Sequence, residues 1–136
     1  MAMTCVEKTV WCKTSFIGFH CWPEAPREVL HLRSPHRHQF NVEVHVLVDH
    51  SDRAVEFQML KSTVDHLLAS NGMFVCIRNP GRIADTMTAY SYSCEMMAEE
   101  LAKALAVRGH TVHKVTVDED GENGATLYFC EEPTTK

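Results

Sequence analysis

The sequence predicts an α+β fold in which four antiparallel strands form one sheet and two helices cover one face of it. Two long segments near the N-terminus alternate apolar and polar residues, as half-buried strands do. Two later segments place apolar residues three and four positions apart, which is typical of helices that rest on a core. The last two alternating segments flank a turn of Asp-Gly and Asn-Gly pairs, which favours a hairpin. All 136 residues are expected to form one domain.

The first two strands are expected at Thr9–His20 and from His36 to about His50. Gly18, near the end of the first strand, suggests a bulge or a close approach of the backbone. The connection over residues 22–35 is long for a hairpin, which predicts a functional loop. Because an open sheet leaves its edge strands unpaired, we expect the sheets of separate subunits to join at these edges.

The first helix is expected to begin near Phe57, and the Asn71-Gly72 pair predicts its end. Residues 73–88 contain a Pro-Gly pair and are expected to be irregular. Ser93 is a suitable N-cap for the second helix, which Gly109 should end. The last two strands are then expected at Thr111–Glu119 and Ala125–Cys130.

Composition narrows the class of protein. Charged residues make up 23% and apolar residues 45% of the chain, and the formal net charge is −5. This balance gives no electrostatic reason to expect a nucleic acid or an anionic membrane as partner. None of the six cysteines has CxxC spacing, and no run is long and apolar enough for a signal or a membrane span. We therefore expect a cytoplasmic protein with reduced thiols.

Three histidines predict a metal site. His36 and His38 lie two residues apart at the start of the second strand, so their side chains point to the same face. His20 ends the first strand and can supply a third ligand if the two strands pair. Three histidine nitrogens with a fourth position left open form a common type of catalytic zinc site. The alternative is that all three are loop histidines at strand ends that bind nothing.

Glu119 is a candidate for holding the ring of a ligand. It ends the third strand on the same face as two valines, which puts a carboxylate at the rim of an apolar surface. A carboxylate there can accept two parallel hydrogen bonds from the N–H groups of an aminopyrimidine ring. The alternative is a solvated acid, because Asp118, Asp120 and Glu122 surround it.

No general base is evident from the sequence, and the candidates are weak. Cys21 and Cys94 are the thiols nearest to the expected site, but Cys21 should point away from the metal and Cys94 begins an apolar helix stripe. His31 could act as a base or a substitute ligand, although an exposed loop histidine is the commoner case. Asp65 and His66 are adjacent on a helix, where neighbouring residues do not face each other.

Taken together, these residues resemble the 6-pyruvoyltetrahydropterin synthase and 6-carboxytetrahydropterin synthase family over nearly the whole chain. Five segments carry the resemblance, and they occur in the family's order on the expected elements. They are Phe16–His20, similar to the strand that ends in a zinc histidine; His36-Arg37-His38, similar to His-Gly-His; Val55–Lys61, similar to Val-x-Asp-Phe-x-x-Leu-Lys; Ser93-Cys94-Glu95, similar to Pro-Thr-x-Glu; and Val117–Glu119, similar to the strand whose glutamate anchors the pterin ring.

The resemblance implies the tunnelling fold (T-fold), in which trimers close a β-barrel and two trimers stack as a homo-hexamer. It implies zinc at His20, His36 and His38, and a pterin-like pocket at subunit interfaces with Glu119 and Glu95 as ligand-binding residues. The family's activity is that of a lyase, which eliminates triphosphate from dihydroneopterin triphosphate. In that reaction a cysteine acts as general base and an Asp-His pair assists.

The chain departs from the family at the groups that transfer protons. Leu32 stands where the family has its cysteine, four residues before His36. Residues 70–80, where the family has its Asp-His pair, contain neither residue type, and Asp65-His66 comes too early. Losing one such base can cost on the order of a hundred- to ten-thousand-fold in rate. The metal site and the ring anchor are therefore expected to persist without the usual proton-transfer groups.

Two functions from different classes follow. The first is a zinc-dependent, lyase-like enzyme that acts on a pterin- or purine-like metabolite with altered chemistry and an unknown base. The second is a non-catalytic protein that binds such a metabolite without turnover. A third interpretation, a cupin-like metal motif, rests on the spacing of His36, His38 and Glu43, but the two helices between the strand pairs argue against it.

Overall fold

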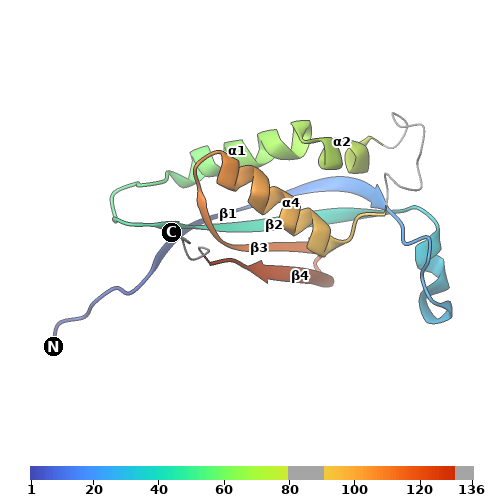
Figure 1. The fold of residues 1–136 in the computed structure, drawn as a ribbon, viewed down its shortest axis with the longest axis horizontal. Helices are drawn as coiled ribbons and strands as arrows, with labels where there is room; N and C mark the ends of the chain where they lie inside the picture. The colour runs from blue at the N-terminus through green and yellow to red at the C-terminus, as the bar shows by residue number, and fades with distance from the viewer. Residues whose placement is uncertain (80–90, 131–136) are drawn as a thin grey trace, which may run out of the picture.

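The computed structural model describes residues 1–79 and 91–130. The helices lie on one side of a four-stranded sheet (Figure 1), whose strand order is β1-β2-β3-β4 with every neighbouring pair antiparallel. This confirms the predicted fold class. In chain order the elements are β1 Lys8–His20, the 3-10 segment η1 Arg27–Arg33, β2 His36–Val48, α1 Phe57–Ser70, α2 Gly72–Arg78, α4 Cys94–Val107, β3 Thr111–Glu119 and β4 Asn123–Tyr128.

The strand register brings the candidate site residues to one end of the sheet. β1 and β2 pair without interruption, from Lys8 opposite Val48 to His20 opposite His36. β3 ends beside the same part of β2, where Glu119 lies opposite Phe40. Because side chains alternate along a strand, this register points the side chains of His20, His36 and Glu119 to the same face.

That face carries the core. Alternate residues of β1, β2 and β3 point toward the helices, while the residues between them form the opposite, more polar face. The apolar stripes of α1 and α4 close over the strands. Fully buried side chains of this core include Phe40, Val42, Val44, Val115 and Val117 from the sheet, and Leu60, Val64, Met97, Leu101 and Leu105 from the helices.

The predicted end of the first helix is right, but the chain does not become irregular there. Asn71 follows α1 and also caps α2, because its side-chain oxygen accepts a hydrogen bond from the Met73 N–H at 3.1 Å. Phe74 and Ile77 then anchor α2 in the core, with 1% and 0% of their surface exposed. The expectation of irregular structure is therefore wrong for residues 73–78, and its part from residue 80 onward lies outside the described residues.

Smaller differences have local causes. The last strand begins at Asn123 rather than at residue 125, because Asp120 and Gly121 adopt positive φ values of 57° and 75° and complete the turn early. Gly18 makes a close approach and no bulge: a Cβ there would lie 2.5 Å from Cγ2 of Ile77. The long connection before β2 contains η1, which the sequence did not indicate.

The sheet of one chain is open, since β1 and β4 each have one neighbour in the described sheet. The helices that rest on it rule out the cupin-like interpretation, which requires an all-β barrel. No helix in the described parts of the chain is long and apolar enough to cross a membrane.

Candidate metal centre

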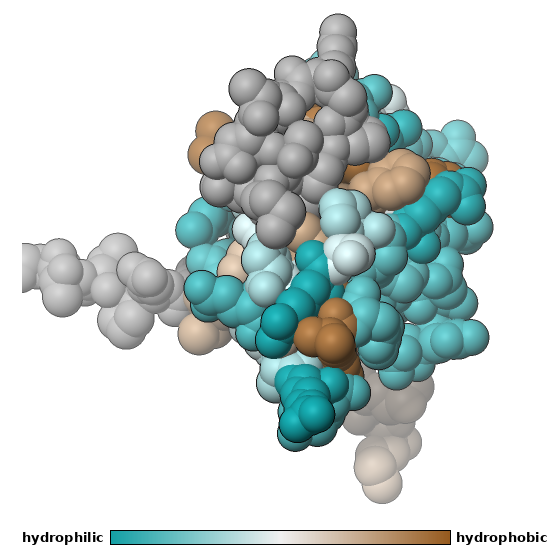
Figure 2. Space-filling model, turned by 90° about the vertical axis from the view of Figure 1, so that its right-hand side faces the viewer, coloured by the Kyte–Doolittle hydropathy of each residue, from teal (hydrophilic) through white to brown (hydrophobic). Residues whose placement is uncertain are grey.

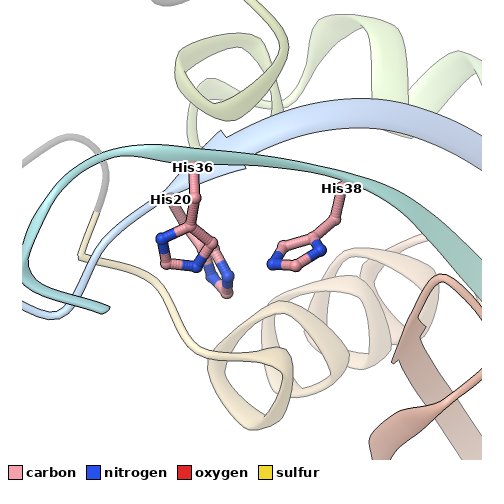
Figure 3. A group of neighbouring side chains, drawn as sticks. All are labelled: His20, His36 and His38. Carbon is pink, nitrogen blue, oxygen red and sulfur yellow. The ribbon is translucent and has the colours of Figure 1, made fainter. Parts of the chain in front are cut away.

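His20, His36 and His38 converge at the end of the sheet. The ring centroid of His20 lies 4.6 Å from that of His36 and 5.3 Å from that of His38. The centroids of His36 and His38 are 4.9 Å apart. One nitrogen of each ring lies within 4.8 Å of the others. The three rings point to the side of the sheet that faces α4 (Figure 3). This group could hold a metal ion.

Each imidazole is held by an acceptor at its outer nitrogen. Nδ1 of His20 lies 2.8 Å from the Tyr92 carbonyl, and Nδ1 of His36 lies 2.9 Å from the Ser34 carbonyl. Nδ1 of His38 lies 2.6 Å from a carboxylate oxygen of Asp120. Because these three partners can only accept, each Nδ1 carries a hydrogen, and in the neutral imidazole each Nε2 is left with its lone pair. Such outer hydrogen bonds fix the tautomer that a metal requires.

The inner nitrogens form no hydrogen bond with the described part of the protein. Among the described residues, the buried Nε2 atoms of His20, His36 and His38 form no hydrogen bond. Buried polar atoms without a partner are uncommon in folded proteins, and an ion that occupies the site would explain them. Burial also lowers the pKa of His20, which outweighs the opposing effect of its hydrogen bond to Tyr92. The neutral imidazole is the form that binds a metal.

Glu119 and Asp120 lie against this group with different roles. The Glu119 carboxylate approaches the inner nitrogens, at 2.9 Å from Nε2 of His20 and 3.4 Å from Nε2 of His38. The 2.9 Å contact is close but not directed as a hydrogen bond, since that nitrogen has no such partner. Asp120 binds the outer nitrogen of His38 and also accepts the Gln39 N–H at 2.8 Å, so it ties β2 to the turn after β3.

A cleft of about 490 Å³ adjoins the histidines. It gathers aromatic and apolar side chains beside two carboxylates, the combination that small-molecule sites commonly use. Figure 2 shows the end of the molecule at which β1 ends, where the visible surface is mostly hydrophilic around a smaller apolar area. The lining residues of the cleft include His20, His36, Trp22, Leu32, Tyr92, Met96, Glu95 and Glu119.

The weak candidates for a base remain weak in the structure. Cys94 contributes to the cleft, but burial and the nearby Glu119 raise the pKa of its thiol to about 12. Burial also raises the pKa of Cys21. His31 lies exposed in η1 and does not line the cleft. Leu32 does line it, so an apolar side chain stands where the resemblance calls for a cysteine.

The adjacent pair Asp65 and His66 is also separate from the site. Asp65 is exposed on α1 and accepts a hydrogen bond from the Thr14 hydroxyl of β1 at 2.5 Å. His66, its neighbour in the sequence, is exposed. The interpretation of this pair as a solvated helix face agrees with these positions.

Sequence reasoning missed the groups that orient the histidines. The Tyr92 and Ser34 partners are backbone carbonyls, which any residue type provides, so no sequence signal could have identified them. Asp120 had such a signal, because it directly follows Glu119 and opens the turn opposite the start of β2. The sequence interpretation treated it only as part of the turn.

Comparison with solved structures identifies the fold. An uncharacterized protein from Wolinella succinogenes superposes with a TM-score of 0.64 at 17% identity, over 91% of this chain and 99% of that one. A 6-pyruvoyl tetrahydropterin synthase from Caenorhabditis elegans superposes with a TM-score of 0.61 at 14% identity, over 95% and 100%. The chain has the T-fold. At these identities the likeness extends to the fold alone, and neither a protein-family model nor a curated protein sequence matches the chain.

Proposed function

We propose that His20, His36 and His38 bind one zinc ion and that the adjoining cleft binds a small heteroaromatic metabolite. The observation that carries the metal proposal is the orientation of the rings: every Nδ1 is held by an acceptor, and every Nε2 is buried without a hydrogen bond to the described residues. Nitrogen ligands of this number and kind suit zinc. A bound zinc ion polarises an oxygen of its ligand and lowers the pKa of the proton on it.

The ligand is proposed to be pterin- or purine-like. The cleft offers two carboxylates, Glu95 and Glu119, that can accept hydrogen bonds from the N–H groups of such a ring. Trp22 and Tyr92 supply aromatic surface beside them, which suits a flat ring. The sequence resemblance to the tetrahydropterin synthases and the shared fold with the Caenorhabditis elegans synthase support this choice.

The protein is proposed to act as one T-fold domain per chain in a homo-hexamer, a dimer of trimers. β1 and β4 leave backbone hydrogen-bonding groups free at the two edges of the described sheet, and pairing these edges between subunits would satisfy them. The proposal rests on these edges and on the family resemblance.

Within this site, we favour a lyase-like enzyme with altered chemistry over the family's own reaction. Leu32 lines the cleft in place of a cysteine, and the thiol of Cys94 is held in its protonated form at neutral pH. A base would therefore come from elsewhere, and its identity stays open. The same two observations favour the second candidate function, a homologue that binds the metabolite without turnover.

Zinc binding is tested first, because both candidate functions depend on it. We would measure zinc binding by calorimetry for the wild type, for His36→Ala and for His45→Ala. His45 is a matched control because its Nε2 is also buried without a hydrogen bond among the described residues, but its side chain lies on the other face of the sheet. The proposal predicts one zinc per chain, lost in His36→Ala and kept in His45→Ala.

Calorimetry with neopterin and guanine derivatives would then follow on the zinc-loaded protein. Binding that needs zinc, together with turnover of the ligand, supports the enzyme and contradicts the non-catalytic binder. Binding without turnover contradicts the enzyme. If neither class of compound binds, the proposed ligand is wrong even where the metal site is right.

A further inference from the structure

The position of Glu119 is unexplained if it serves only to hold a ligand ring. Its carboxylate lies 2.9 Å from Nε2 of His20, a residue with 8% of its surface exposed, and 3.4 Å from Nε2 of His38. The outer nitrogens of both rings face acceptors, so in the neutral form that binds a metal their inner nitrogens present lone pairs. Two lone pairs and a carboxylate repel each other at these distances unless a positive charge lies between them.

A hydrogen on Nε2 of His20 does not account for the contact. If that nitrogen carried a hydrogen directed at Glu119, the pair would form a charge-assisted hydrogen bond, and such bonds are well aligned. The direction of the contact does not meet this condition, because Nε2 of His20 has no hydrogen-bond partner among the described residues. An oxygen that lies close to a ring nitrogen but off its axis is the arrangement of two ligands around one ion.

We infer that Glu119 is the fourth protein ligand of the metal in the absence of a small molecule. Ligands of a tetrahedral zinc ion at 2.0–2.1 Å lie about 3.3 Å from one another. Oε1 of Glu119 lies 2.9 Å from Nε2 of His20 and Oε2 lies 3.4 Å from Nε2 of His38, so each oxygen is near this separation from one of the histidines. The ligand nitrogens of the three histidines lie within 4.8 Å of one another, and no oxygen of Glu119 lies that close to all three, so the rings and the carboxylate would close on the ion.

This inference rests on the proposed zinc site and changes how a small molecule reaches it. Three histidines alone would leave the fourth position open to water. With Glu119 bound, that position is closed, and an oxygen of the ligand must displace the carboxylate. The freed carboxylate then lies beside the ligand, where it can accept hydrogen bonds from a ring. One residue thereby serves the metal in one state and the ligand in the other.

The test compares Glu119→Gln with Glu122→Gln, using Co²⁺ in place of zinc as a visible probe. Glu122→Gln is the matched control, because it removes the same charge from the turn beside Glu119, while its exposed side chain does not line the cleft. Each variant is titrated with Co²⁺ and then, when loaded, with azide, an anion that binds an open metal position. Circular dichroism melting checks that both variants fold as the wild type does.

We expect Glu119→Gln to bind Co²⁺ at least tenfold more weakly and azide at least tenfold more tightly than the wild type, with Glu122→Gln unchanged in both. If Glu119→Gln matches Glu122→Gln in both titrations while the wild type binds Co²⁺, the fourth position is already open and the inference is wrong. If the wild type binds no metal, the proposed zinc site fails as well. The two failures are therefore distinguishable.

Discussion

Replacing Asp120 by Asn tests how the protein sets the chemistry of His38. Asp120 accepts the Nδ1 hydrogen of His38 with one oxygen, at 2.6 Å, and the Gln39 N–H with the other, at 2.8 Å. The hydrogen bond from His38 lowers the pKa of Asp120, so the carboxylate is ionised at neutral pH. In Asp120→Asn only one oxygen remains to serve two donors.

Either orientation of the amide leaves one of the two donors without its acceptor. If its oxygen keeps the Gln39 N–H, the NH₂ group faces Nδ1 of His38 and favours the tautomer with the hydrogen on Nε2, which cannot bind a metal. If the oxygen faces His38 instead, the NH₂ group opposes the Gln39 N–H. Removing such an outer partner of a metal-bound histidine typically lowers metal affinity 10- to 100-fold, and we expect a loss in this range.

Competition with a chromophoric chelator would measure zinc affinity in the wild type, in Asp120→Asn and in Glu122→Gln. Glu122→Gln removes one negative charge from the same turn, and its side chain is exposed. We expect its affinity to stay within about threefold of the wild type, because a charge at an exposed position is screened. Equal affinities in Asp120→Asn and Glu122→Gln would refute the reasoning, since the effect would then be one of charge alone.

Three further predictions concern the fold, the thiols and the assembly. Gly18→Ala should lower the free energy of unfolding in urea by about 1–3 kcal/mol, because the added Cβ would meet Ile77 at 2.5 Å. Gly72→Ala, where a Cβ has free space, should not destabilise the protein, and equal losses in the two variants would contradict the packing. Cys94, with a thiol pKa of about 12, should resist alkylation at pH 8 in the metal-free protein, whereas exposed Cys5 should react; peptide mass spectrometry showing equal rates would argue against this burial. Native mass spectrometry should show six subunits, and a monomer at micromolar concentration would contradict the proposed edge pairing.

The fold could be predicted from local patterns because they agree with one another. Alternation in the first two segments, the N-cap at Ser93 and the paired turn residues after Glu119 each act over a few residues, and each was found where expected. The segment after Asn71 was missed because one side chain ends a helix and begins the next, and a Pro-Gly pair further along suggested disruption. Burial of Phe74, a tertiary effect, decided its structure.

The convergence of the three histidines could also be predicted, because the period of a strand and one assumed strand pairing place them together. The details of the site could not. The carbonyl partners of His20 and His36 carry no sequence signal. The approach of Glu119 to the inner nitrogens depends on the register of β3 against β2. A shift of one residue would have turned the Glu119 side chain to the other face of the sheet.

Three histidine nitrogens are proposed to bind one zinc ion, and X-ray absorption at the zinc edge on the loaded, ligand-free protein measures the ligands of that ion. We expect one zinc per chain with nitrogen and oxygen neighbours at about 2.0–2.1 Å and the outer-shell scattering of three imidazoles. A sulfur neighbour at about 2.3 Å, or fewer than three imidazoles, would contradict it.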